Sequence, residues 1–401
     1  MAGAHTYAGL MGTRFTLGLF EAACLPVFTM MVSNWYRRAE QPIRIAAFYS
    51  MNGIGTIVGS GIVYGLGHVK TTTLHTYQIV FLFFGLITCI TAPFLYWKLD
   101  NSPESARFLS PEDRIKAVAR LRSNQAAHSN EGTFEIKWSH VIEIVTEPKT
   151  IGWIGMTFLL NLGASVSSVF GPLILNGLGY SSYLTSLLNM PFGALQFILI
   201  LSASYAAYSF KVKGPIFFVM MLPTLAGVAM LWGLGRTHSD QAPLLAAYYL
   251  IAFLFAGNPL LVSWITANTA GQTKKSIILA LYQASSSAGN IAGPQLFHSK
   301  DKPEYKPGLK ATMASFIVLV VLILLQIVGL MVLNKLKERQ RVANGKPAKL
   351  VDLSMTHHFA QDAGQTEVEA GVDGRERMTH AEKAAALDMT DRQNDEFQYV
   401  L

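Results

Sequence analysis

Nine apolar segments of roughly twenty residues constrain the fold of this chain more than any other feature. The hydrocarbon core of a bilayer is about 30 Å thick, so a helix rising 1.5 Å per residue needs about twenty apolar residues to cross it. The chain is therefore predicted to be an all-α, polytopic membrane protein with about nine transmembrane helices. The segments cover residues 15–32, 45–66, 79–97, 151–175, 184–208, 215–233, 243–266, 277–296 and 311–333.

One charged stretch divides these segments into three and six. About half of the residues are hydrophobic and 14% are charged, and the charges gather between the apolar segments. The unequal division predicts that part of a symmetric molecule is missing from this chain. The predicted parts are a three-helix partial N-terminal bundle (1–97), a cytoplasmic central loop (98–150), a six-helix C-terminal bundle (151–334), and a cytoplasmic, largely disordered tail (335–401).

Lysines and arginines concentrate in alternate loops, which indicates orientation in a membrane rather than nucleic-acid binding as the reason for the net charge of +7. Basic loops favour the cytoplasmic side, so the N-terminus is predicted outside and the C-terminus in the cytosol. The residues that mark the predicted cytoplasmic side include Arg37, Arg38, Arg44, Lys98, Arg107, Arg114, Lys116, Lys137, Lys149, Lys211, Lys213, Lys274 and Lys275.

The sequence predicts a helix in one polar region and disorder in another. Ser110 followed by Pro111, Glu112 and Asp113 is typical of a helix N-terminus and predicts a surface helix that runs through Leu121. The tail after residue 341 has no sustained apolar period, so it is predicted to be disordered. Its final residues, 397–401, are either a sorting or docking signal or an inert end.

Arg14 and Glu21 are the plainly ionisable residues within or at the edge of the apolar segments. They are seven residues apart, two helical turns, and so lie on one helix face. A charge at mid-bilayer costs roughly 2.5 to 3.5 kcal/mol, which makes such residues functional candidates. Glu21 is a candidate proton carrier and Arg14 a candidate anion-binding group. The alternative is a structural ion pair that joins this helix to a neighbour.

Neutral polar residues at helical spacing in the later segments are candidates for binding a small polar substrate. Such residues also form hydrogen bonds between helices, which is the alternative for each of them. Two asparagines stand just before prolines, where a freed carbonyl or a broken helix at membrane depth is typical of a cavity wall. The candidates are Asn161, Ser165, Asn189, Asn258, Tyr282, Gln283 and Asn290.

Glycines in the second apolar segment lie at four-residue spacing and predict close packing against another helix. They are Gly53, Gly55, Gly59, Gly61, Gly65 and Gly67. The sequence shows no Walker loop, no His/Cys metal cluster and no Ser-His-Asp arrangement, so an enzyme and a cofactor are not predicted. Cys24 and Cys89 fall inside apolar segments, where a disulfide framework is not expected.

Several motifs carry a resemblance to a known family. The run 14–22 (RFTLGLFEA) resembles the fourth-helix signature of the major facilitator superfamily, in the form of fungal anion:cation symporters related to allantoate permease. The most specific matches are 268–275 (NTAGQTKK), 289–295 (GNIAGPQ) and 303–308 (PEYKPG), and the C-terminal residues 389–399 are similar to the family's tail. The resemblance covers nearly the whole chain.

The resemblance implies a major facilitator fold of two six-helix bundles, in which this chain corresponds to helices 4 to 12 and lacks the first three. It implies a monomeric plasma-membrane carrier that moves a small organic anion, such as a ureide, vitamin or nicotinate-like acid, with a proton by alternating access. The spans with Arg14 and Glu21, Asn161 and Asn258 would line the cavity. The competing hypotheses are a non-transporting membrane protein with a binding or regulatory role and a passive channel.

Overall fold

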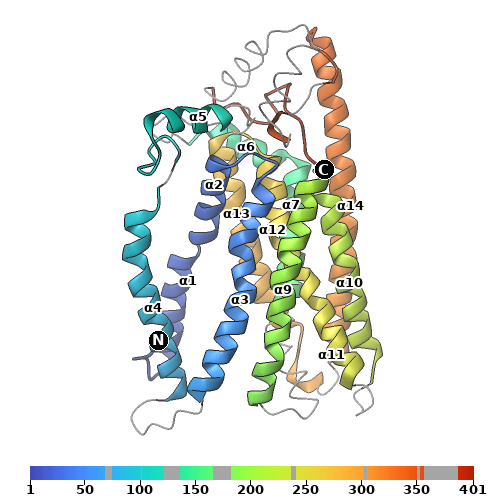
Figure 1. The fold of residues 1–401 in the computed structure, drawn as a ribbon. Coiled ribbons are helices and arrows are strands. Elements are labelled where there is room, and N and C mark those ends of the chain that lie inside the picture. The colour runs from blue at the N-terminus through green and yellow to red at the C-terminus, as the bar shows by residue number, and fades with distance from the viewer. Residues whose placement is uncertain are drawn as a thin grey trace.

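The protein is a bundle of long helices that lie side by side (Figure 1). The structure is a computed structural model, and it describes residues 1–67, 75–100, 102–121, 136–165, 182–235, 241–301, 305–349, 353–355 and 387–401. Within these ranges the chain forms helices and connecting turns, with no strand. The two termini lie toward opposite ends of the bundle (Figure 1). The predicted all-α, multi-pass fold is confirmed.

Seven described helical segments are long and apolar enough to cross a membrane. The two other predicted spans correspond to α7, whose described part ends at Ser165, and to α13, in which serine and asparagine residues interrupt the apolar surface. The seven segments are Tyr7–Trp35, Gln41–Leu66, Thr76–Lys98, Leu187–Phe210, Gly214–Gly233, Gln241–Ala267 and Lys306–Ala343.

The N-terminal half consists of α1 (Tyr7–Glu21), α2 (Cys24–Trp35), α3 (Gln41–Gly67) and α4 (Thr76–Lys98). The first predicted span is broken, because α1 ends at Glu21 and α2 begins at Cys24. Pro26 explains the break: it has no N–H to donate to the carbonyl of residue 22, and its ring would clash with that carbonyl. The span predicted at 15–32 lies within the segment Tyr7–Trp35.

The central loop contains two short helices, α5 (Pro111–Leu121) and α6 (Trp138–Thr146). The Ser110 hydroxyl accepts a hydrogen bond of 3.1 Å from the backbone N–H of Asp113, as the sequence predicts for an N-cap. In Figure 1 both helices lie at the end of the bundle that also holds the C-terminus. We call this the basic end, since Arg37, Arg38 and Lys274 are among its residues, and it is the side predicted to be cytoplasmic.

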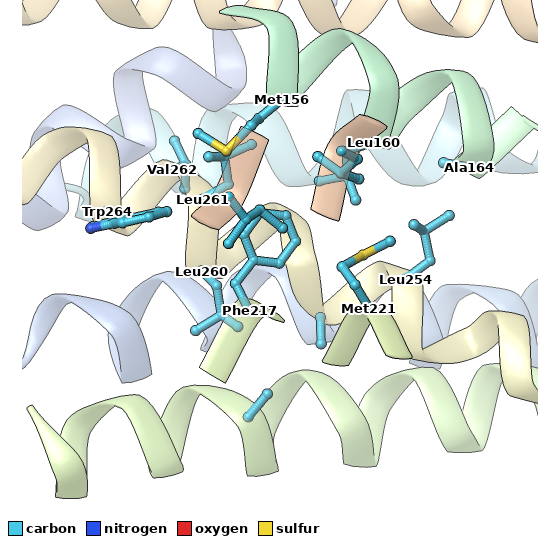
Figure 2. Close-up of a cluster of buried hydrophobic side chains, with 14 of the residues drawn as sticks. Met156, Leu160, Ala164, Phe217, Met221, Leu254, Leu260, Leu261, Val262 and Trp264 are labelled. Carbon is cyan, nitrogen blue, oxygen red and sulfur yellow. The ribbon is translucent and has the colours of Figure 1, made fainter. Parts of the chain in front are cut away.

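The C-terminal half holds most of the buried core. In Figure 2, side chains from three of its helices meet, with Phe217 beside Leu260 and Leu261, and Met156 nearby. All four are essentially without exposed surface. The half is built from α7 (Pro148–Ser165), α9 (Ser182–Phe210), α10 (Gly214–Gly233), α11 (Gln241–Leu250), η3 (Ile251–Ala256), α12 (Gly257–Ala267), α13 (Gln272–Gln295) and α14 (Lys306–Ala343), with short turns η4 (Ser299–Asp301) and η5 (Leu353–Met355).

The two halves meet most extensively where α3 packs against α9. A Cβ atom at Gly53 would lie 2.7 Å from the backbone nitrogen of Phe197, so only glycine allows this approach. Gly61 is also close to α9, since its Cβ would lie 3.2 Å from the Met190 methyl carbon. The predicted close packing is therefore found at these glycines, whereas Gly55, Gly59 and Gly65 have no heavy atom within 4 Å of the Cβ position.

The last residues differ from the prediction of a disordered tail. Residues 387–401, which we call the C-terminal segment, pack against the basic end, and Phe397 and Tyr399 are buried there. Asp391 is also fully buried. The physical reason is that a few apolar side chains and one carboxylate fit partners on α12, α13 and α14, which a local sequence pattern does not reveal. Residues 356–386 lie outside the described part of the chain.

Candidate functional site

A cavity of about 520 Å³ lies between the two halves. The N-terminal half contributes residues of α1, α2 and α3, and the C-terminal half contributes residues of α7, α9, η3, α12 and α13. Its apolar lining is Cys24, Leu25, Phe28, Phe48, Ala164, Ile200 and Phe255, and its polar lining is Glu21, Tyr49, Asn52, Asn161, Gln196, Asn258, Tyr282, Gln283, Ser286 and Asn290.

Glu21 lines this cavity at the break between α1 and α2. It is the last residue of α1 and stands three residues before the start of α2. Among the described lining residues, Glu21 is the only one that belongs to the aspartate, glutamate, lysine, arginine or histidine types.

A second interrupted helix contributes to the cavity from the C-terminal half. The span predicted at 243–266 is divided into α11, the 3-10 turn η3 and α12, and Pro259 stands in the first turn of α12, as Pro26 does in α2. Asn258, the residue before this proline, lines the cavity. Broken helices at membrane depth are tolerated where they line a cavity, and transporter sites are often built from them.

A chain of hydrogen bonds crosses the cavity wall from one half to the other. The Asn258 side-chain oxygen accepts from the Tyr282 hydroxyl at 3.0 Å and from the Asn161 amide nitrogen at 3.4 Å. The Tyr282 hydroxyl also lies 3.1 Å from the Tyr49 hydroxyl of α3. These contacts join α7, α12 and α13 of one half to α3 of the other.

Two further predicted residues, both on α13, reach the cavity. The side-chain oxygen of Gln283 is buried and has no hydrogen-bond partner in the structure, so it remains free to accept from a ligand. Asn290 lines the cavity with an exposed side chain, whose amide nitrogen donates to the Ser286 carbonyl at 3.1 Å. Together with Asn161, Asn258 and Tyr282, these residues form the part of the predicted site that the fold brings together.

The other candidates lie elsewhere. Arg14 is not among the lining residues, and its guanidinium lies over the ring of Phe81 on α4, 5.2 Å from the centroid. The ion pairs found among the described residues include none between Arg14 and Glu21, although both are on α1. Asn189 accepts a hydrogen bond of 2.7 Å from the Tyr248 hydroxyl, so it joins α9 to α11 outside the cavity. Ser165 ends α7, and its side chain lies outside the described part of the structure.

Four polar lining residues were not predicted as candidates, and one of them is Ser286 on α13. Tyr49 and Asn52 are on α3, where the glycines suggested a helix-packing surface and nothing more. Gln196 is on α9 and is 3% exposed. Asn52 and Gln196 are polar residues within apolar segments, and the same feature marks the residues that were predicted as candidates. This feature could therefore have identified both of them.

The basic end holds three buried carboxylates close enough to bind a metal ion, those of Glu143, Glu147 and Asp391. The ammonium of Lys274 already lies among them, 2.5 Å from Glu143, 2.8 Å from Glu147 and 2.9 Å from Asp391. A lysine in that position supplies the positive charge a metal would bring. This cluster is therefore an ion-pair network.

Sequence comparisons place these features in a known context. The family model of the Major Facilitator Superfamily matches residues 1–294. An uncharacterized transporter of Schizosaccharomyces pombe is 33% identical over 321 residues, covering 80% of this chain and 60% of that protein. The allantoate permease of Saccharomyces cerevisiae is 27% identical over 362 residues, covering 87% of this chain and 65% of the permease. The chain spans about 60% of the length of the first curated relatives it matches.

Solved structures show the same fold. The proton:xylose symporter XylE aligns with a TM-score of 0.56 at 12% identity, covering 74% of this chain and 65% of XylE. The human organic anion transporter MFSD10 aligns with a TM-score of 0.55 at 14% identity, covering 80% of this chain and 72% of MFSD10. The match of the family model, which covers the described cavity lining but not α14, identifies this multi-pass membrane protein as a member of the Major Facilitator Superfamily of transporters.

Proposed function

We propose that the protein is a secondary active transporter that moves a small organic anion across a membrane by proton symport and alternating access. The observation that carries the proposal is the cavity between the two halves, where Glu21 is the one charged side-chain type among the described lining residues. Alternating access needs a site between two bodies that can open in turn, and the cavity has walls from both.

The charge of Glu21 gives a physical mechanism for coupling. When Glu21 is protonated, the described wall carries no net charge, and an anion enters without repulsion. When Glu21 is ionised, two negative charges about 6 Å apart at an effective dielectric constant of about 20 repel by roughly 3 kcal/mol, a factor of about 100 in affinity. The anion therefore binds together with a proton, which is the requirement for symport.

Neutral polar groups would hold the substrate in this mechanism. Gln283 offers a buried oxygen without a partner, and Asn258 and Tyr282 offer groups that exchange one hydrogen bond for another. Such groups bind a polar molecule without making its release slow, which a carrier requires. We propose Asn161 and Asn290 as further contacts. Arg14 lies over Phe81, outside the cavity, so its proposed attraction for the anion would act at a distance.

The name of one of two characterised relatives supports the substrate class. One relative in Saccharomyces cerevisiae is named allantoate permease, and another is named as a thiamine pathway transporter. The first name denotes a carboxylate. The proposal includes a plasma-membrane location and a monomer as the working unit, which membrane fractionation and gel filtration in detergent test.

Uptake into proteoliposomes tests the transport proposal. The purified chain is reconstituted with a proton gradient, and accumulation of radiolabelled allantoate and of nicotinate, as probes, is followed over time. We expect gradient-driven accumulation that collapses on addition of a protonophore. Glu21→Gln, which is neutral at every pH, should abolish pH-driven accumulation while leaving reconstitution intact.

Glu112→Gln is the matched control, since Glu112 is an exposed residue in the first turn of α5, outside the cavity. It should accumulate the probe as the parent does. Uptake in Glu21→Gln that equals the parent would remove Glu21 from the mechanism. Equilibration without accumulation would favour a passive channel, and absence of flux for all probes would favour a non-transporting role.

A further inference from the structure

The C-terminal segment is held by the C-terminal half through its backbone. The carbonyl of Val400 accepts from the Trp264 indole at 2.8 Å and from the Asn268 amide at 2.9 Å, and the Val400 N–H donates to Asn268 at 2.7 Å. Asn334 of α14 makes the same two-way contact with Tyr399, with both bonds at 2.8 Å. Two asparagines therefore each bind one residue of an extended chain at both of its polar groups.

A buried ion pair network fixes the other end of the segment. Asp391 lies between the ammonium groups of Lys149 and Lys274, and both lysines are buried. The Tyr399 hydroxyl donates to Asp391 at 2.9 Å, which ties the two anchors together. Hydrogen bonds to a charged group are the stronger kind.

Arg38 links this segment to the N-terminal half. Arg38 lies between α2 and α3 and is 1% exposed. Its guanidinium donates to the carbonyl of Gln398 at 2.8 Å and to the carbonyl of Ala267 at 2.5 Å, and it lies over the Phe397 ring, 4.9 Å from the centroid. One side chain of the N-terminal half thus contacts both α12 and the C-terminal segment.

The halves are in contact between the cavity and the basic end. The Tyr49 and Tyr282 hydroxyls meet at the cavity wall. Closer to the basic end, Gln41 of α3 accepts from Thr266 of α12 at 3.4 Å. Ser276 of α13 lies 3.7 Å from the Met30 sulfur of α2. The Arg38 contacts link the halves at the basic end, as does the Ala39 N–H, which donates to the Ser354 carbonyl at 3.2 Å, so these contacts must break before the cavity can open toward that end.

We propose that Arg38 and the C-terminal segment form a latch that holds the two halves together at the basic end, and that Arg38 is a gating residue. The proposal deepens the proposed alternating access and rests on it. The segment is bound mainly to the C-terminal half, so it stays with that half when the latch opens. Opening therefore separates the Arg38 guanidinium from the Gln398 carbonyl and from the Phe397 ring.

The labelling rate of a buried cysteine tests the latch. Thr266→Cys is made in a chain with Cys24→Ser and Cys89→Ser, because Thr266 is 1% exposed and lies in the contact layer. A water-soluble maleimide reacts with it only when the basic end opens. A cation over an aromatic ring contributes about 0.5 to 2 kcal/mol, so Phe397→Ala should raise the labelling rate roughly 2- to 30-fold.

Three comparisons accompany this measurement. Leu387→Ala removes a large side chain from the same segment, but Leu387 is 67% exposed, so the rate should stay at the parent value. Arg38→Lys should raise the rate as Phe397→Ala does, since an ammonium lacks the planar fork that spans two carbonyls and a ring. Met221→Cys, which is fully buried in the C-terminal half, should remain unlabelled throughout.

Two results would overturn the latch. One is a labelling rate at Thr266→Cys that stays at the parent value in both Phe397→Ala and Arg38→Lys. The other is equal acceleration at Thr266→Cys and Met221→Cys, which would mean general loosening of the fold. The labelling needs neither a substrate nor a proton gradient, so a failed uptake experiment would leave this result interpretable.

Discussion

Lys274 of α13 donates to Asp391 of the C-terminal segment across 2.9 Å, and both side chains are without exposed surface. Burial alone would lower the pKa of Lys274, but the carboxylates of Asp391 and Glu147 outweigh burial, so the net shift is upward. For Asp391, burial alone would raise the pKa, but Lys149 and Lys274 hold it well below its ordinary range. Each partner therefore keeps the other ionised inside the protein.

Asp391→Asn should destabilise the protein by roughly 3 to 5 kcal/mol, because removing one partner leaves buried charge without compensation. Thermal unfolding of the detergent-solubilised protein measures this as a lower Tm. Asp113→Asn is the control, since the Asp113–Lys116 pair is 59% and 75% exposed at its side chains and should barely change Tm. Equal Tm values for the parent and Asp391→Asn would contradict the network.

Gly53→Ala should destabilise the contact between the halves, because the added methyl group would meet the backbone of α9. Overpacking of this kind costs about 1 to 3 kcal/mol. Gly55 is on the same helix with no atom within 4 Å of its Cβ position, so Gly55→Ala should be neutral or slightly stabilising. Thermal melting curves give the Tm of each variant. Equal Tm values for Gly53→Ala and Gly55→Ala would refute the close approach of α3 to α9 at Gly53.

The helical architecture was predictable because each crossing requires a run of apolar residues, and that requirement is local in sequence. The Ser110 cap and the α5 helix followed from local signals in the same way. The break before α2 was also accessible, since Pro26 marks it as Pro259 marks the break before α12. Asn258 was selected from its proline, whereas Glu21 was selected from its charge alone.

The other features of the site and of the C-terminal segment depend on contacts between residues that are far apart in the chain. Asn189 stands two residues before Pro191 and Asn258 stands directly before Pro259, yet Asn189 contacts Tyr248 and Asn258 lines the cavity. Tyr49 becomes a cavity residue because Tyr282, far along the chain, is opposite it. The C-terminal segment has a polar composition, and its order comes from side chains such as Asn268 that match its backbone. Neither composition nor periodicity contains that information.

Asn258→Ala and Asn189→Ala should separate a cavity role from a packing role. Loss of one neutral hydrogen bond costs about 0.5 to 1.5 kcal/mol. We expect Asn258→Ala to raise the KM of whichever anion probe is accumulated by roughly 2- to 10-fold. Asn189→Ala should leave KM unchanged and lower Tm, because it removes the partner of Tyr248. A raised KM in both variants, or in neither, would contradict a cavity role for Asn258 and a packing role for Asn189.

His140 should make the stability of the folded protein depend on pH. Burial lowers the pKa of His140 below its ordinary 6.5, and Lys137 and Lys274 add to this, against the opposing effects of Asp388 and Glu143. The folded state therefore binds fewer protons at His140 than the unfolded state as the pH falls below about 6.5, so acid destabilises the fold and higher pH restores its stability. Above this window both states hold a neutral imidazole, and the effect disappears.

Thermal unfolding of the detergent-solubilised protein at pH about 7.5 and about 5.5 measures this effect, since histidine gains its proton in that range. The Tm of the parent should fall between the two values. His140→Gln is neutral at both values and should show a smaller fall in Tm than the parent. An equal fall in Tm in His140→Gln would assign the response to other groups, because glutamine has no proton to gain in this range.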